Sequence, residues 1–159
     1  ADCRRQRQMC IKRQAYNKRP LFIKGDPELM KQVCLNIILN AVQSMPDGGR
    51  LRIETDQRIE SGNSTPAWME LRISDSGSGI PLKQMGKIFD PFFTTKARGT
   101  GLGLSIVHSI VQKHGGHIDV ESDPGSGTEF CIHLPLCSRQ EVHDFREAAA
   151  EEMKREAFA

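Results

Sequence analysis

The chain has 159 residues, of which 38% are hydrophobic, and a formal net charge of +2 at pH 7. This length predicts about one domain with a core of its own, and the small net charge argues against nucleic acid as a partner. The longest apolar run, around Val33 to Val42, is interrupted by two asparagines. We therefore expect no membrane span, no signal peptide and no membrane contact by this fragment. Because the chain begins at Ala1 without a methionine, we also expect it to be excised from a longer protein.

Cysteine and histidine usage shows no spacing typical of a metal site. The cysteines are odd in number and form no C-x-x-C pair, which favours reduced thiols in the cytoplasm over zinc ligands. Four histidines are scattered through the second half of the chain, and we expect satisfied or surface side chains there rather than ligands. These residues are Cys3, Cys10, Cys34, Cys131 and Cys137, with His108, His114, His117 and His133.

Charge and motif content divide the chain into three parts. Residues 1–20 are basic and poorly periodic, and we interpret them as a connector from a missing upstream domain that includes a short strand around Gln8–Gln14. An anionic partner for this segment is the less favoured alternative. Residues 21–137 hold all the motifs described below, and residues 138–159 are expected to form a charged, Ala-rich helical extension.

A long helix is predicted after Asp26, which has the N-cap side chain, with Pro27 at the first helical position. The helical pattern runs to about Met45 and is apolar nearly all round, so we expect the helix to be buried. Asn36 and Asn40 are four residues apart and share one face of it. Two amides within an apolar helix need polar partners, and an asparagine carbonyl is a good ligand for Mg²⁺, which accompanies nucleotide phosphates.

Alternating patterns predict strands on either side of a second helical region. Residues 50–59 and 67–75 are expected to form an antiparallel pair, and a short helix is expected over residues 81–87. Residues 117–122 and 128–134 are expected to form a hairpin. The chain therefore combines a meandering sheet with helices.

Asp75 ends one of these strands on its inward, apolar face. A carboxylate at the edge of a core is costly unless hydrogen-bond donors surround it. Gly77 and Gly79 follow directly, and their lack of side chains allows a flat ligand to approach this carboxylate.

A phenylalanine cluster and a polar loop precede the second long helix. Phe89, Phe92 and Phe93 are expected to anchor a mobile lid formed by residues 94–100. The helix is predicted over residues 101–114, and glycines at its start present bare N–H groups at the positive end of the helix dipole, which suits phosphate. A buried acceptor for a base and a seat for phosphates, one strand and one loop apart, predict a nucleotide site.

These motifs, in their order along the chain, resemble the catalytic, ATP-binding domain of bacterial sensor histidine kinases, within the GHKL (Bergerat-fold) ATPase superfamily. The resemblance covers residues 25–136. Each motif alone is weak, but all of them in order form a specific pattern. The matching segments are Asn36–Asn40 (N box), Asp75–Gly79 (first glycine box), Phe89–Lys96 (F box), Gly99–Leu104 (second glycine box) and Gly125–Phe130 (closing Gly-Thr strand).

The resemblance implies roles for the residues at matching positions. Asn40 would ligate Mg²⁺ with support from Asn36, and Lys96 would act from the ATP lid as the third catalytic residue. Asp75 would accept a hydrogen bond from the adenine amino group, and Thr128 would bond nearby through its hydroxyl or a water.

The implied nucleotide contacts extend along all the boxes, and backbone N–H groups of residues 101–104 would hold the phosphates. The implied contacts are Asn40, Gln43, Asp75, Gly77, Gly79, Ile80, Phe89, Thr94, Thr95, Lys96, Gly99, Thr100, Gly101, Leu102, Gly103, Leu104 and Thr128. One position departs from the pattern, because many members have Lys or Arg three residues after the second Asn, where this chain has Gln43. Lys96, Lys87 or Arg98 is expected to compensate.

The fold that the resemblance implies is an α/β two-layer sandwich, with a mixed, mostly antiparallel sheet covered on one face by helices. The implied activity is transfer of the γ-phosphoryl group of ATP, with Mg²⁺, to a histidine on a separate dimerisation domain of the same parent protein. A cognate response regulator is the implied partner. An anti-sigma-type serine kinase and a GHKL ATPase that uses ATP as a conformational clamp remain as alternatives.

Other nucleotide-binding patterns do not fit the sequence. Residues 99–104 lack the glycine spacing of a Rossmann motif, and neither a P-loop nor a set of protein-kinase motifs occurs. Residues 143–146 faintly resemble the opening of a phosphoacceptor box. They follow the ATP-binding segment and lack the usual proline, so we favour coincidence.

Overall fold

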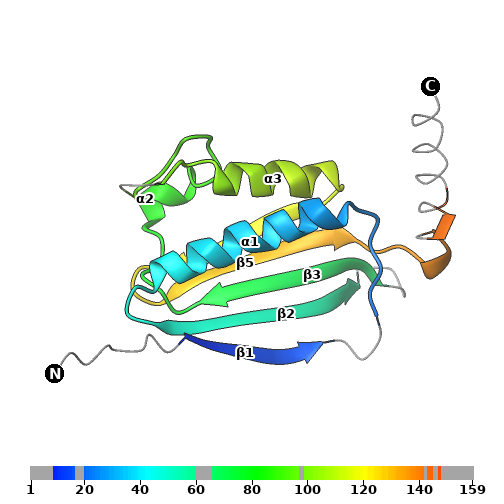
Figure 1. The fold of residues 1–159 in the computed structure, drawn as a ribbon, viewed down its shortest axis with the longest axis horizontal. Helices are drawn as coiled ribbons and strands as arrows, with labels where there is room; N and C mark the ends of the chain where they lie inside the picture. Colours follow the sequence, from blue (N-terminus) through cyan, green and yellow to red (C-terminus); the bar gives the residue numbers. More distant parts are fainter. Residues whose placement is uncertain are drawn as a thin grey trace.

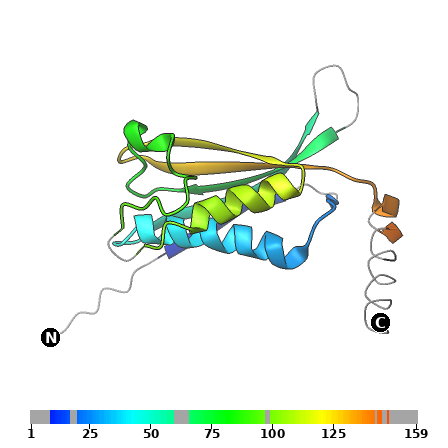
Figure 2. The same cartoon turned by 90° about the horizontal axis from the view of Figure 1, so that it is seen from above.

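The computed structural model describes residues 9–16, 20–59, 66–96, 99–141, 143–144 and 147. Its helices cover one face of a single sheet, which gives two layers (Figures 1 and 2). The elements are β1 (Met9–Tyr16), α1 (Pro27–Ser44), β2 (Gly49–Ile59), β3 (Pro66–Asp75), α2 (Leu82–Met85), α3 (Gly103–Lys113), β4 (His117–Asp123) and β5 (Gly127–Pro135).

The sheet has five strands in the order β1-β2-β3-β5-β4. The β1 strand runs parallel to β2, whereas the other neighbouring pairs are antiparallel. A parallel neighbour requires a crossover, which α1 supplies between β1 and β2. The predicted mixed, mostly antiparallel sheet with helices on one face is confirmed, as is a strand near residues 8–14.

Alternation along the strands directs one set of side chains toward the helices. Ile73 of β3 lies opposite Phe130 of β5, and Leu71 lies opposite Ile132, so apolar side chains meet in cross-strand pairs. The helices α1 and α3 lie side by side over this surface (Figure 1). The buried core consists of Val33, Ile37, Ala41, Met45, Leu51, Ile73, Ile88, Val107, Ile110, Val111, Phe130, Ile132 and Leu134.

The α1 helix begins as predicted, because the Oδ1 of Asp26 accepts from the N–H groups of Glu28 at 2.8 Å and Leu29 at 3.3 Å. The expectation of burial all round is wrong, since Leu35 is 56% exposed and Leu39 is 46% exposed. The helix packs against the sheet on one side and against α3 on another, so its remaining side stays open.

Two details of the segment before α3 also differ from expectation. The helix begins at Gly103 rather than at residue 101, because Gly101 has a φ of 70°, which is left-handed and incompatible with a helix. Phe89 and Phe93 pack partly against the core, but Phe92 is 75% exposed with a φ of 67°. The three phenylalanines therefore do not form one cluster.

Parts of the sequence-based organisation lie outside the described residues. These parts include most of the connector 1–20, Arg98 of the predicted lid, and most of the extension 138–159. The three-part division therefore stays a prediction. Among the helices that the structure describes, none is long and apolar enough to cross a membrane.

Candidate nucleotide-binding site

Most of the predicted site residues line one cavity of about 500 Å³, between α1, the end of β3 and the segment that leads into α3. This cavity brings together residues from all the boxes, which are distant in sequence. The predicted residues that line it are Asn36, Asn40, Gln43, Asp75, Gly79, Ile80, Thr94, Thr95, Lys96, Gly99, Thr100, Gly101, Gly103, Leu104 and Thr128.

Three predicted contacts do not line the cavity. The backbone N–H of Gly77 donates to Asp75 at 2.8 Å, so this glycine supports the site from behind. Phe89 packs against the core and lies 5.2 Å from the ring of His108. Leu102 is the half-buried residue before α3. The side chains of Phe89 and Leu102 therefore do not contribute to the lining of the cavity.

Several lining residues were missed by the sequence analysis. Ser44 had a usable signal, since it follows Asn40 by four residues and thus continues the Asn36–Asn40 face of α1. Four of the others lie within the boxes but were not assigned contacts. Gln84 and Ile88 lie outside the boxes, and their place depends on the fold. The missed residues are Leu39, Ser44, Ser78, Gln84, Ile88, Phe93 and Phe130.

The half-buried carboxylate of Asp75 accepts hydrogen bonds from two nearby groups. Its Oδ1 accepts from the hydroxyl of Ser44 at 3.0 Å and from the N–H of Gly77 at 2.8 Å. A Cβ at Gly77 would lie 1.9 Å from the Ser44 Oγ, so only glycine allows this close approach. The hydrogen bonds fix the direction of the carboxylate.

Thr128 lies directly opposite Asp75 in the pairing of β5 with β3. Its hydroxyl is buried and lies 2.9 Å from the Oγ of Ser122, which also accepts from the N–H of Ile80 at 2.8 Å. The two neighbouring strands thus place a carboxylate and a hydroxyl side by side at the inner end of the cavity, which suits the polar edge of a base.

Lys96 joins the lid segment to α1 on the other side of the cavity. Its ammonium group donates to the Oδ1 of Asn40 at 2.9 Å and to the Oε1 of Gln43 at 2.6 Å. Desolvation of this end of the side chain lowers the pKa of Lys96, and the Asp75 carboxylate partly opposes the shift. The same helix face carries the buried Nδ2 of Asn36, which has no partner among the described residues.

The start of α3 presents backbone donors beside this cation. No side chain caps the helix at Leu102, so its first N–H groups remain available to an anion. Gly101 is held in place by Phe92, whose N–H donates to its carbonyl at 3.0 Å. A Cβ at Gly101 would lie 2.3 Å from the carbonyl carbon of Phe92, so this turn also requires glycine.

The cavity therefore has two chemically different ends. Asp75 and Thr128 form an end that accepts hydrogen bonds, whereas Lys96 and the first turn of α3 form an end that attracts anions. ATP is complementary to both ends, because the amino group of adenine donates hydrogen bonds and the phosphates are anions.

Comparison with known proteins agrees with this geometry. Residues 25–138 match the family described as "Histidine kinase-, DNA gyrase B-, and HSP90-like ATPase". The signal transduction histidine-protein kinase AtoS of Escherichia coli is 48% identical over 114 residues, which are 72% of this chain and 18% of AtoS. The chain spans about a fifth of the length of such curated relatives.

Solved structures of the same class share the fold. The mycobacterial sensor histidine kinase MprB is 34% identical with a TM-score of 0.66, over 79% of this chain and 79% of that one. The full-length kinase ShkA, solved in complex with AMPPNP, is 27% identical with a TM-score of 0.62, over 75% of this chain and 24% of that one. The chain therefore belongs to the histidine kinase-, DNA gyrase B- and HSP90-like ATPase family, as an ATP-binding domain of the sensor-histidine-kinase type.

Proposed function

We propose that this chain binds Mg²⁺–ATP and delivers the γ-phosphoryl group to a histidine on a separate dimerisation domain of its parent protein. A cognate response regulator would then receive the phosphoryl group. One observation carries the proposal: the cavity has the Asp75 carboxylate at one end and the Lys96 ammonium with the N-terminus of α3 at the other.

Adenine would bind at the Asp75 end. Both described hydrogen bonds to this carboxylate use Oδ1, which leaves Oδ2 for the exocyclic amino group of adenine. Gly79 keeps the approach open, because its φ of 69° and its contact with Asp123 exclude a side chain. Thr128 would supply a further polar contact to the base edge.

The phosphates would bind at the other end. The N–H groups of residues 101–104 and the ammonium group of Lys96 would neutralise them. Lys96 would thereby supply the positive charge that the uncharged Gln43 lacks. Lys87 is exposed and does not line the cavity, so it is the weaker candidate for this compensation.

Asn40 fits the role of a Mg²⁺ ligand. Its Oδ1 is a neutral, hard oxygen, and it already contacts a cation in the form of the Lys96 ammonium. The Nδ2 of Asn36, one turn away and without a partner among the described residues, would find an acceptor in a phosphate oxygen. The ion would neutralise charge that develops on the phosphates, while the protein positions the nucleotide.

The serine-kinase and clamp-ATPase alternatives use the same type of pocket, so the cavity alone does not separate them. The sensor-kinase names of the relatives favour transfer to histidine. Because transfer requires an acceptor nitrogen in line with the γ-phosphorus, a domain without its acceptor should bind ATP yet not label itself.

The test is incubation of this chain with γ-labelled Mg²⁺–ATP, alone and with the upstream domain added as a separate polypeptide. We expect acid-labile, base-stable label only on the added domain, at a low yield because the covalent link is absent. Label on serine, or ATP hydrolysis without transfer, would support an alternative. Label on this chain that is lost in His143→Ala would promote the segment 143–146 to a true acceptor.

A further inference from the structure

The face of the sheet opposite the helices carries a buried histidine that the ATP site does not use. Ile132 and Leu134 of β5 point into the core, so alternation places His133 on the other face. Its side chain is nevertheless only 3% exposed, because His117 of the edge strand β4 stacks on its ring with centroids 4.3 Å apart.

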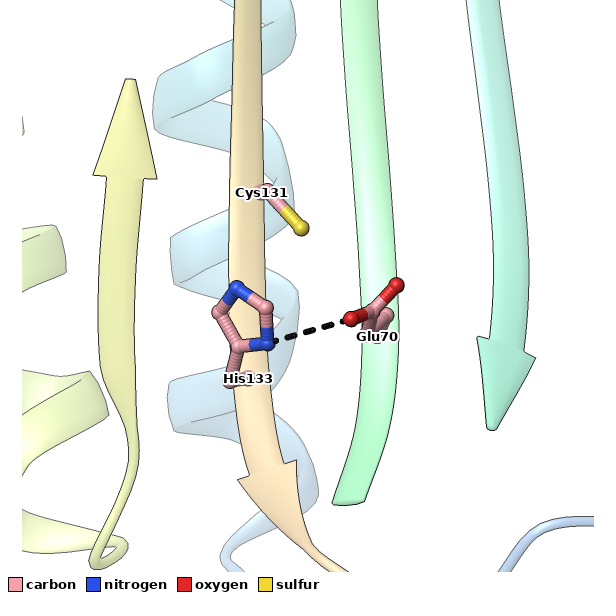
Figure 3. Close-up of side chains that lie close together, drawn as sticks. All are labelled: Glu70, Cys131 and His133. Atoms are coloured by element: carbon pink, nitrogen blue, oxygen red, sulfur yellow. Dashed lines mark ion pairs between the residues drawn. The ribbon is translucent and has the colours of Figure 1, made fainter. Parts of the chain in front are cut away.

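The two ring nitrogens of His133 face different carboxylates. Figure 3 shows Nδ1 directed toward Glu70 of β3, and the Oε1 atom of Glu70 lies 3.5 Å from it. The Nε2 atom points to the other side, where the Oδ2 of Asp119 lies 3.1 Å away. Despite this distance, Nε2 is buried without a hydrogen-bond partner among the described residues.

The tautomer of His133 decides how Nε2 meets Asp119. With the proton on Nδ1, toward Glu70, the lone pair of Nε2 faces the carboxylate of Asp119 at 3.1 Å. A proton on Nε2 or a metal ion between the two groups would make this contact favourable. Because Nε2 has no hydrogen-bond partner among the described residues, the geometry favours the metal ion.

We propose that His133, Asp119 and His117 form a binding site for a divalent transition-metal ion, with Zn²⁺ as the best match. One ligand atom from each of these three residues lies within 4.8 Å of the others. Two imidazole nitrogens and one carboxylate oxygen are a typical zinc ligand set that leaves a fourth position for water. Glu70 would orient His133 through Nδ1, as second-sphere carboxylates do at metal-bound histidines.

The site requires a small rearrangement of one exposed side chain. The rings of His117 and His133 are parallel, with an interplanar angle of 6°, so their in-plane lone pairs cannot meet at one ion. His117 is exposed, and turning its ring requires only that it leave its stacking on His133 and its edge contact with Trp68. His133, which the fold holds in place, would form the fixed half of the site.

Cys131 offers a second set of ligand atoms with Glu70 and His133, but charge makes this set unsuitable. The Glu70 carboxylate already pairs with the guanidinium groups of Arg72 and Arg58. A dication there would face these two positive charges.

The test is zinc titration of the chelator-treated chain by calorimetry, without nucleotide. We expect Asp119→Asn and His117→Gln each to weaken zinc binding by more than about tenfold. Both residues are exposed, so neither substitution should prevent folding. His143→Gln is the matched control, because that exposed histidine also has a carboxylate partner, Glu147, at 3.6 Å.

A second readout identifies the ligands directly. The Co²⁺ complex should show the intense visible bands of a four-coordinate ion without a sulfur-to-cobalt charge-transfer band, and Cys131→Ser should leave it unchanged. Zinc should also raise the Tm of the wild type but not of Asp119→Asn. Equal zinc affinity in the wild type, Asp119→Asn and His117→Gln would overturn the proposal. A thiolate band that is lost in Cys131→Ser would also overturn it, in favour of the Cys131 set.

Discussion

The ammonium group of Lys96 lies 2.6 Å from the amide oxygen of Gln43, although 53 residues separate them in sequence. A lysine from the segment that we predict to be a lid thus reaches the position on α1 where the family resemblance leads us to expect a cation. This contact makes the lid itself a source of the charge needed at the phosphate end of the cavity.

Loss of the positive charge at Lys96 should be compensated by a new positive charge at position 43. We expect Lys96→Gln to weaken Mg²⁺–ATP binding by about 10- to 100-fold, because a charge-assisted hydrogen bond contributes about 1.5–3 kcal/mol. The additional change Gln43→Lys should restore most of the affinity in calorimetry. Lys87→Gln is the control and should bind like the wild type. A double variant no better than Lys96→Gln would show that the two positions are not equivalent.

Adenine should be preferred to guanine through Asp75. Guanine would present a carbonyl to a carboxylate, and the unpaired acceptors would cost about 1–3 kcal/mol. Competition binding with ATP and GTP measures this preference. We expect Asp75→Asn to weaken ADP binding while the chain stays folded, as circular dichroism would report. Asp56→Asn on the exposed part of β2 is the control, and equal affinity for the two nucleotides would refute the assignment.

Asn40→Asp should preserve the fold but reduce the affinity for Mg²⁺–ATP by about fivefold or more, since a new negative charge beside the phosphates costs at least about 1 kcal/mol. Calorimetry at several Mg²⁺ concentrations would measure the effect. Gln32→Glu adds the same charge to an exposed position of α1 and should have no effect. An unchanged affinity in Asn40→Asp would remove Asn40 from the metal site.

Nucleotide should slow hydrogen exchange in residues 94–96 and 99–100. These residues are exposed and contribute no buried apolar side chain, so bound phosphates would be their main source of order. Mass spectrometry with and without Mg²⁺–ATP tests this expectation. The buried stretch of α1 around Ile37 serves as reference. Equally slow exchange in both states would argue against a lid.

Much of the lining of the cavity could be predicted because its residues depend on local chemistry. Asp75 ends a strand at a point where two glycines follow, and Asn36 and Asn40 share a helix face through spacing alone. The residues that were missed, such as Phe130 and Ile88, are ordinary core residues in the sequence. They reach the cavity only because β5 pairs with β3 and because α3 lies beside α1.

The histidine cluster shows the opposite case. His117 and His133 appeared scattered, since 16 positions separate them and no motif links them. The antiparallel register of β4 and β5 makes them direct partners, and the next strand adds Glu70 opposite His133. Cross-strand register is a property of the whole sheet, so a linear inspection of spacing does not find such a cluster.

The hydrogen bond from Phe92 to Gly101 has a consequence for how the lid can vary. It closes the base of the segment 93–100, so the ends of this segment stay together whatever its length. For a loop whose ends are already fixed, doubling its length costs only about 0.6 kcal/mol of closure entropy. We therefore expect the fold to tolerate extra residues in this segment, whereas exchange of Thr94 or Lys96, which line the cavity, would alter the pocket.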